Sequence, residues 1–173
     1  MIYFAYNANM VTYLLCKGIG EVEVIGMAKL AAHKFLVNKR SGDRSLKANI
    51  VQSDNLEDYV YGVAYKIDPI KKRKLDRIEQ LDRDYQVKQS LVEVFDGSFC
   101  QAIVYYAKAD RPVKNFPYDC YMNLIITGAT EHSLPQTYIT FLNRFRTKKD
   151  FKSARTAMAL ALLDESRLPR KHL

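Results

Sequence analysis

Six or seven short segments with the pattern of β-strands fill the first two thirds of the sequence, and they limit the folds that the chain can adopt. In the clearest one, residues 59–67, large residues alternate with small ones, and Gly62 and Ala64 leave room for close packing on one face. The expected strands span residues 2–6, 21–27, 30–37, 47–51, 59–67, 85–94 and 99–107. Strands so short and numerous, with helices between and after them, predict an α+β fold whose strands curl into a small mixed β-barrel with flanking helices.

The segments between and after the strands carry signals for helices and turns. Residues 68–81 predict a helix, because Asp68 can cap its N-terminus and Pro69 suits its first turn. The apolar stripe expected on this helix consists of Ile70, Leu75, Ile78 and Leu81. Asp96-Gly97 predicts a hairpin, and Ser133 begins a capping-box pattern at the start of a later helix. Further helices are expected over residues 11–17 and 118–128 and from about residue 151.

Composition narrows the class of protein. The 173 residues suffice for one domain with a core, and 48% hydrophobic with 27% charged residues is ordinary for a soluble globular protein. The net charge of +8 allows weak attraction to nucleic acid. However, the basic run at 71–74 is the solvated side of an amphipathic helix, and aromatic residues do not alternate with the basic ones, so nucleic-acid binding is not favoured. Neither a membrane-spanning segment nor a signal peptide is expected, and we expect a cytoplasmic protein.

Cysteines and histidines give no sign of a metal or redox centre. Cys16, Cys100 and Cys120 are widely spaced, which fits neither a disulfide framework nor a metal motif. The three histidines have no carboxylate or cysteine at ligand spacing, and the common glycine-rich phosphate loops are missing from the sequence. We therefore expect no metal site.

The turn that follows the opening strand has two interpretations. Asn7, Ala8 and Asn9 come directly after the apolar residues 2–6, so the chain turns abruptly there. Asparagine tolerates a positive φ, and such a turn can present backbone N–H groups to a carboxylate or phosphate. Alternatively, it is an ordinary strand-to-helix turn with Asn9 as the helix N-cap. The residues alone favour the second interpretation.

Glu79 is the candidate for proton-transfer chemistry. It lies at the margin of the apolar stripe of the expected helix, where partial desolvation would raise the pKa of its carboxyl group. The alternative is a surface glutamate paired with Arg83 one turn later, and helix geometry alone favours that alternative. Tyr85 follows the helix closely and could direct its hydroxyl to the molecule on which Glu79 acts. Alternatively, it could be an aromatic residue of the core.

Five stretches between residues 2 and 142 form an ordered series. They read YFAYNANM at 3–10, KRS with KANI at 39–50, YGVAY at 61–65, LDRIE followed by Tyr85 at 75–85, and GA through LPQTY at 128–138. Together they resemble the gamma-glutamylcyclotransferase-like (AIG2-like) family, whose opening reads YFAYGSNM and whose later segments read GVxY, LDxxEG…Y and GA…GLPxxY. Residues beyond 147 lie outside the resemblance, so we expect the family domain over residues 1–147 and a helical extension with a charged tail over residues 148–173.

The resemblance implies a function and a site. It implies a small mixed barrel, without metal or cofactor, that converts a gamma-glutamyl amine or amino acid to 5-oxoproline and a free amine. Carried over by position, the substrate-binding loop is Tyr6, Asn7, Ala8 and Asn9. Glu79 matches the general acid/base, and Tyr85 lies near the substrate. A homodimer is a further expectation.

Two residues depart from the family pattern. Asn7 stands where the family usually has glycine, and Gln80 stands where glycine usually follows the catalytic glutamate. Asparagine could adopt the left-handed backbone of a glycine, but its side chain would narrow the pocket or change its hydrogen bonds. The alternative function is therefore a binding protein of the same fold that has lost or altered its catalysis, with a gamma-glutamyl-like or other small anionic ligand.

Overall fold

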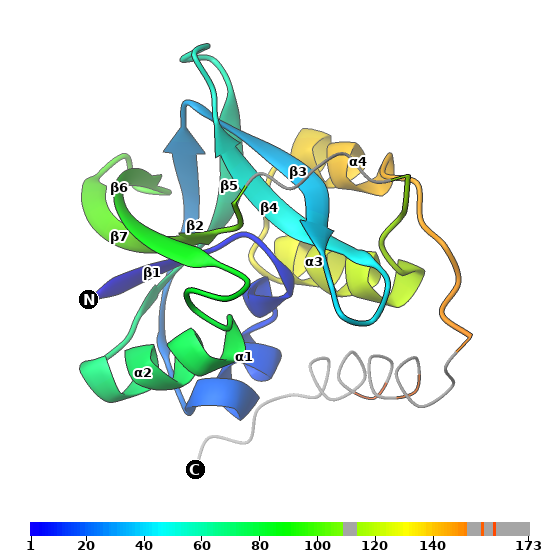
Figure 1. Ribbon diagram of the computed structural model, residues 1–173. Helices are drawn as coiled ribbons and strands as arrows, with labels where there is room; N and C mark the ends of the chain where they lie inside the picture. The colour runs from blue at the N-terminus through cyan, green and yellow to red at the C-terminus, as the bar shows by residue number, and fades with distance from the viewer. Residues whose placement is uncertain (109–113, 152–156, 158–160, 162–173) are drawn as a thin grey trace.

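The computed structural model describes residues 1–108 and 114–151, together with 157 and 161, and it contains a closed five-stranded barrel (Figure 1). The barrel strands, in spatial order, are β1 (Ile2–Ala5), β5 (Tyr59–Lys66), β2 (Glu23–Ala31), β6 (Gln86–Val94) and β7 (Phe99–Tyr106). Neighbouring strands are antiparallel except at the closure, where β1 runs parallel to β7. The expected α+β class with a small mixed barrel is confirmed.

Two of the seven predicted strands do not join the barrel. β3 (His33–Arg40) and β4 (Leu46–Gln52) pair with each other in a separate two-stranded sheet. The long strand β2 ends at Ala31, and Ala32 then adopts a left-handed backbone with φ of 53°, which turns the chain into β3. The predicted break after residue 27 is therefore wrong: β2 stays continuous through this region, which carries no turn residues.

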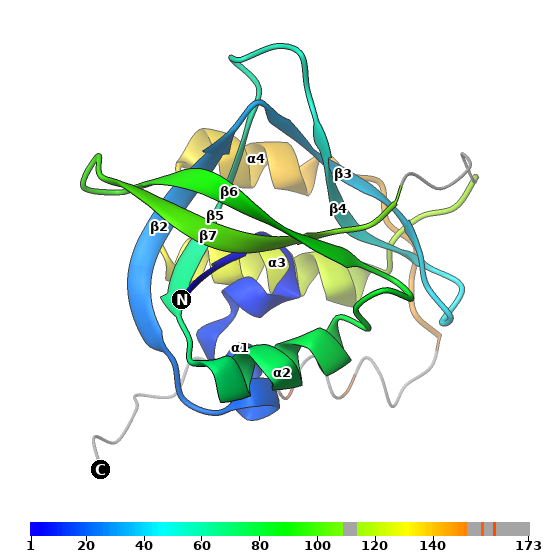
Figure 2. The ribbon, with the colours of Figure 1, turned by 60° about the vertical axis from the view of Figure 1, so that its left-hand side comes forward.

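Helices cover one end and one side of the barrel (Figures 1 and 2). α1 (Thr12–Ile19) and α2 (Pro69–Ile78) lie side by side across one end, and α3 (Asp119–Glu131) and α4 (Gln136–Asn143) pack together beside the barrel. A short 3-10 helix, η1 (Ala8–Met10), joins β1 to α1 and packs against α3. The turn that follows β1 thus lies between the barrel and α3.

Close backbone contacts at two glycines hold this arrangement together. A Cβ atom on Gly62 would lie 2.7 Å from the Phe4 ring and would also clash with the backbone oxygen of Ala5, so β5 can approach β1 only without a side chain there. A Cβ atom on Gly128 would lie 2.6 Å from the backbone carbon of Met10. The close packing predicted at Gly62 is confirmed, and Gly128 brings α3 against η1.

Several local predictions need correction. α2 ends at Ile78 rather than residue 81, and of its predicted stripe only Leu75 is buried, while Ile70 and Ile78 are 59% and 46% exposed. α4 begins after Pro135 without a side-chain cap, so the capping box at Ser133 is wrong. The Asp96-Gly97 hairpin is confirmed, with Gly97 at a φ of 81°.

Some predictions lie outside what the structure tests. The helix expected from about residue 151 falls mostly outside the described residues, and the division of the chain after residue 147 stays a prediction. No helix within the described residues is both long and apolar enough to cross a membrane. The cytoplasmic location, the homodimer and the weak case for nucleic-acid binding also stay predictions.

Candidate active site

The turn after β1 is shaped by the side chain of its first asparagine. Asn7 caps η1, because its Oδ1 accepts a hydrogen bond from the Asn9 backbone N–H at 2.9 Å. The prediction of a capped strand-to-helix turn after β1 is therefore confirmed, but the capping residue is Asn7 and not Asn9. The φ of Asn7 is −109°, so this residue does not adopt the left-handed backbone that asparagine tolerates.

Glu79 lies at the C-terminal cap of α2, and a Schellman motif fixes its backbone. The Leu81 N–H donates to the Asp76 carbonyl at 2.9 Å, and the Gln80 N–H donates to the Arg77 carbonyl at 3.2 Å. This motif requires a left-handed residue directly after the cap, and Gln80 supplies it with a φ of 53°. The family's preference for glycine after the glutamate thus has a conformational reason in this chain.

The carboxyl group of Glu79 meets the Asn-rich turn. Its Oε1 accepts hydrogen bonds from the side-chain amides of Asn9 at 2.7 Å and Asn7 at 3.3 Å. The Asn9 amide also donates to the Tyr3 hydroxyl at 3.1 Å. Glu79 is 7% exposed, and Arg83 lies 3.7 Å from Asp84, so the interpretation of Glu79 as a surface residue paired with Arg83 is wrong.

Burial gives Glu79 an unusual acidity. Desolvation raises the pKa of its carboxyl group to about 7, although the amides of Asn7 and Asn9 and the charge of Lys39 act in the opposite direction. Within the described part of the chain, Oε1 of the Glu79 carboxyl group accepts hydrogen bonds and Oε2 accepts none. Oε2 is therefore the oxygen that can exchange a proton with a bound molecule at neutral pH.

A pocket of about 420 Å³ opens over this carboxyl group. We call it the Glu79 pocket; its lining residues are Asn7, Ala8, Asn9, Lys39, Ser41, Gly42, Asp43, Lys47, Ile78, Glu79, Gln80, Arg83, Asp84, Tyr85 and Tyr121. Five of the six residues singled out from the sequence therefore lie together. Tyr6 does not line the pocket, because its hydroxyl donates to the Tyr105 carbonyl at 2.7 Å in the core behind the turn.

Tyr85 contributes its ring rather than its hydroxyl. The hydroxyl donates to the Ala48 carbonyl at 2.8 Å and is thereby engaged in the protein. The Lys39 ammonium lies 5.2 Å from the centre of the Tyr85 ring. Tyr85 thus forms one wall of the Glu79 pocket, and both its predicted contact with the substrate and that of Tyr6 stay predictions.

Apart from Glu79, the charged residues that line the Glu79 pocket were not singled out from the sequence. Lys39 and Asp84 form an ion pair at 2.7 Å, and Lys47 and Asp43 form another at 2.9 Å. Both lysines belong to the KRS and KANI stretches that carry the family resemblance, which was the available signal. Asp84 was not identifiable as the partner of Lys39, because the two residues lie far apart in sequence, whereas Asp43 is only four residues from Lys47.

The left-handed backbone at Gln80 leads to a stability prediction. We expect Gln80→Gly to raise the free energy of unfolding by about 0.5–1 kcal/mol, since glycine adopts a positive φ without the steric cost of a side chain. Denaturant unfolding monitored by circular dichroism measures this change. Gln89→Gly, in the extended backbone of β6, is the control and should lower the stability. An equal loss in both variants would contradict the prediction.

Comparisons with known proteins bear on this architecture. Residues 59–142 match the model of the AIG2-like family. This match covers just under half of the chain, and together with the shared fold it supports a relationship to the AIG2-like family. The match includes α2 with Glu79, β6, β7 and α3, but it begins after the Asn-rich turn. No curated protein matches the sequence.

Solved structures show how far the fold of this chain is shared. A gamma-glutamyl cyclotransferase superposes with a TM-score of 0.78 and 21% identity, over 95% of this chain and 98% of the other. An uncharacterized protein from Homo sapiens gives 0.79 and 22%, over 94% and 97%. YkqA from Bacillus subtilis gives 0.66 and 17%, over 86% of this chain and 56% of the other. At these identities the likeness shows the fold.

Proposed function

We propose that this protein is a cyclotransferase that converts a gamma-glutamyl amine or amino acid to 5-oxoproline and a free amine. One observation carries the proposal: the Glu79 carboxyl group, with a pKa of about 7, lies in a pocket against the turn of Asn7 to Asn9. The shared fold of a gamma-glutamyl cyclotransferase supports it.

The reaction needs one proton acceptor and a folded substrate. The substrate's α-amino nitrogen attacks its own γ-carbonyl carbon, so that a C–N bond forms in a five-membered lactam and the original amide C–N bond breaks. Because nucleophile and carbonyl belong to one molecule, holding the folded conformer supplies much of the acceleration. Glu79 Oε2 takes the proton that the attacking neutral α-amine loses as the lactam forms, and it gives this proton to the nitrogen of the leaving amine.

The neighbours of Glu79 prepare it for both steps. The amides of Asn7 and Asn9 hold Oε1, which keeps the carboxyl group in one orientation. Burial keeps the protonated form accessible at neutral pH, and the positive charge of Lys39 keeps the ionised form accessible as well. A group balanced in this way can accept and donate a proton within one turnover.

The direct test is an assay for 5-oxoproline. The purified protein is incubated with a panel of gamma-glutamyl amino acids and gamma-glutamyl amines, and both products are quantified. We expect 5-oxoproline and the free amine in equal amounts from at least one compound. Stabilisation of the protein against heat by these compounds without turnover would instead favour the altered binding protein, for which the Asn7 side chain in the pocket is the supporting feature.

The pKa of Glu79 predicts the pH dependence of the reaction. Because the carboxylate is the form that accepts the proton, we expect kcat/KM to rise with pH and to level off above the pKa of about 7. Lys39→Met removes a positive charge that lowers this pKa, so the rise should move to higher pH. A rate that does not change between pH 5 and 8 would contradict the assignment.

A further inference from the structure

Tyr105 of β7 connects the two elements that carry the candidate active site. It does not line the Glu79 pocket, and it is buried in the barrel. Its hydroxyl donates a hydrogen bond to Asp76 Oδ1 of α2 at 2.6 Å, and its carbonyl accepts the hydrogen bond from the Tyr6 hydroxyl at 2.7 Å. One buried residue thus reaches both the helix that ends at Glu79 and the turn that holds the asparagines.

The bond to Asp76 acts on the end of α2 that carries Glu79. Asp76 lies three residues before Glu79, and its own carbonyl accepts the Leu81 N–H that closes the C-terminal cap. Burial and the neighbouring carboxyl groups of Asp76 and Glu79 raise the pKa of Tyr105, so its hydroxyl stays protonated as the hydrogen-bond donor. A hydrogen bond from a hydroxyl to a carboxylate is short and strong. It therefore fixes the backbone on both sides of Glu79.

Few other contacts fix α2 on the barrel. Of its ten residues, Leu75 is the buried one, while Ile70 and Ile78 are exposed. In the described part of the chain, the other side-chain hydrogen bonds of this helix stay within the helix and its N-cap or reach α1. The hydroxyl of Tyr105 is therefore the side-chain link from a barrel strand to α2.

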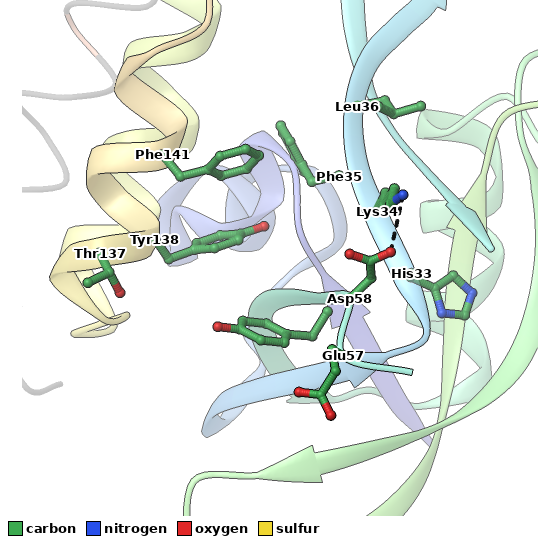
Figure 3. A pocket seen from close by; sticks show the side chains of 10 residues that line it. His33, Lys34, Phe35, Leu36, Glu57, Asp58, Thr137, Tyr138 and Phe141 are labelled. Atoms are coloured by element: carbon green, nitrogen blue, oxygen red, sulfur yellow. Dashed lines mark ion pairs between the residues drawn. The ribbon is translucent and has the colours of Figure 1, made fainter. Parts of the chain in front are cut away.

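The turn after β1, in contrast, is fixed without the help of α2. The ring of Tyr6 meets the ring of Phe35 edge to face, with 6.3 Å between ring centres. Phe35 in turn points from β3 towards Phe141 of α4, as Figure 3 shows. Loss of the Tyr105 hydroxyl would therefore leave the turn in place and release the helix end that carries Glu79.

We propose that Tyr105 is a positioning residue: through Asp76 it holds the Glu79 carboxyl group against the turn. Its role belongs to the proposed cyclotransferase reaction, on which the inference rests, because Glu79 transfers the proton there. The hydrogen bond from the Asn7 amide to Oε1 is already long at 3.3 Å, so a small shift of α2 would break it. A carboxyl group released from the amides presents Oε2 to the substrate in the productive orientation less often.

Tyr105→Phe cuts the link and keeps the ring that packs on Tyr3, so the fold should survive. We expect kcat for 5-oxoproline formation to fall about fivefold with KM nearly unchanged, because the turn stays in place while the proton acceptor moves. Asp76→Ala should lower kcat by a similar factor, and the double variant should lose no more than either single variant. Losses that multiply in the double variant would overturn the proposal, since the two residues would then act separately.

The titration of Glu79 separates positioning from a general loss of stability. The amides of Asn7 and Asn9 lower the pKa of Glu79, so a carboxyl group farther from them should titrate at higher pH. In Tyr105→Phe we expect the midpoint, about 7 in the wild type, to move up by about 0.5. Carbon NMR of the glutamate carboxyl groups measures it, and Glu79→Gln identifies the resonance. An unchanged midpoint would overturn the proposal.

Two controls remove related groups without cutting the link. Tyr106→Phe removes the hydroxyl of the next residue of β7, and Lys72→Met removes the ammonium group that pairs with Asp76 at 2.8 Å. Both should keep the wild-type kcat and midpoint, and a loss in either as large as that of Tyr105→Phe would overturn the proposal. A wild type that forms no 5-oxoproline would refute the proposed function. The carboxyl titration needs no substrate, so it would still decide whether Tyr105 positions Glu79.

Discussion

Glu79→Gln is expected to lower kcat for 5-oxoproline formation by at least about 100-fold, with little change in KM. Glutamine has the shape of glutamate, and its Oε1 can still accept the hydrogen bonds that Asn7 and Asn9 donate. The variant therefore keeps the geometry of the Glu79 pocket but cannot take the proton that the attacking α-amine loses. Steady-state kinetics with the best gamma-glutamyl compound from the panel measures the loss.

The same substitution should change how stability depends on pH. Burial raises the pKa of Glu79 to about 7, above the value near 4.3 of an unfolded glutamate. Between these values the folded state binds more protons than the unfolded state, so stability falls as pH rises through this window, by on the order of 3 kcal/mol. Glu79→Gln removes this dependence, and it should therefore gain stability relative to the wild type between pH 5 and pH 8.

The combination of both effects distinguishes a catalytic group from a structural one. Glu93→Gln, which removes an exposed carboxylate paired with Lys29, is the control and should change neither kcat nor the stability difference between pH 5 and pH 8 by much. Full activity of Glu79→Gln would remove Glu79 from the mechanism. Loss of activity together with loss of stability at pH 8 would indicate damage to the fold instead.

Gly128→Ala is expected to have the second-largest effect, because it separates α3 from the turn that carries Asn9. The added Cβ would lie 2.6 Å from the backbone carbon of the fully buried Met10 and 2.7 Å from the Val11 nitrogen. These are backbone atoms, so α3 has to shift. We expect a loss of about 2 kcal/mol, since overpacking costs about 1–3 kcal/mol and the better helix propensity of alanine offsets part of it.

The activity of Gly128→Ala should fall as well, by about tenfold or more, because a small displacement of positioning groups is costly in catalysis. Thermal unfolding and the 5-oxoproline assay measure the two effects. Asn123→Ala, an exposed position on the same helix, is the control and should be close to the wild type in both. Wild-type stability and activity of Gly128→Ala would show that α3 does not support the turn.

The barrel could be predicted from the sequence because its signals are local. Alternation over residues 59–67 and the Asp96-Gly97 turn give strands and a hairpin without knowledge of any distant residue. The errors came from residues in unusual backbone states. Ala32 and Gln80 adopt positive φ values, and neither residue type signals a turn, so the end of β2 and the end of α2 were misplaced.

The candidate site was predictable only through the family resemblance. Helix geometry alone favoured Glu79 as a surface residue, because the helix was expected to continue past it. In the structure the helix ends there, and the cap turns the carboxyl group towards amides 70 and 72 residues away in sequence. The partnership of Lys39 with Asp84 arises in the same way, from strands and turns that meet only when the barrel is closed.

The parallel closure of the barrel affects how the site is assembled. β1 leads directly into the turn of Asn7 to Asn9, but its partner β7 lies about a hundred residues later in the chain. Contacts of such long sequence separation form slowly, because the intervening loop has to be ordered first. A growing chain therefore holds its first strand without a neighbour on one side until residues 99–106 have been made. The lining of the Glu79 pocket also includes Tyr121, which follows β7 in the chain, so partially synthesised chains lack the finished site.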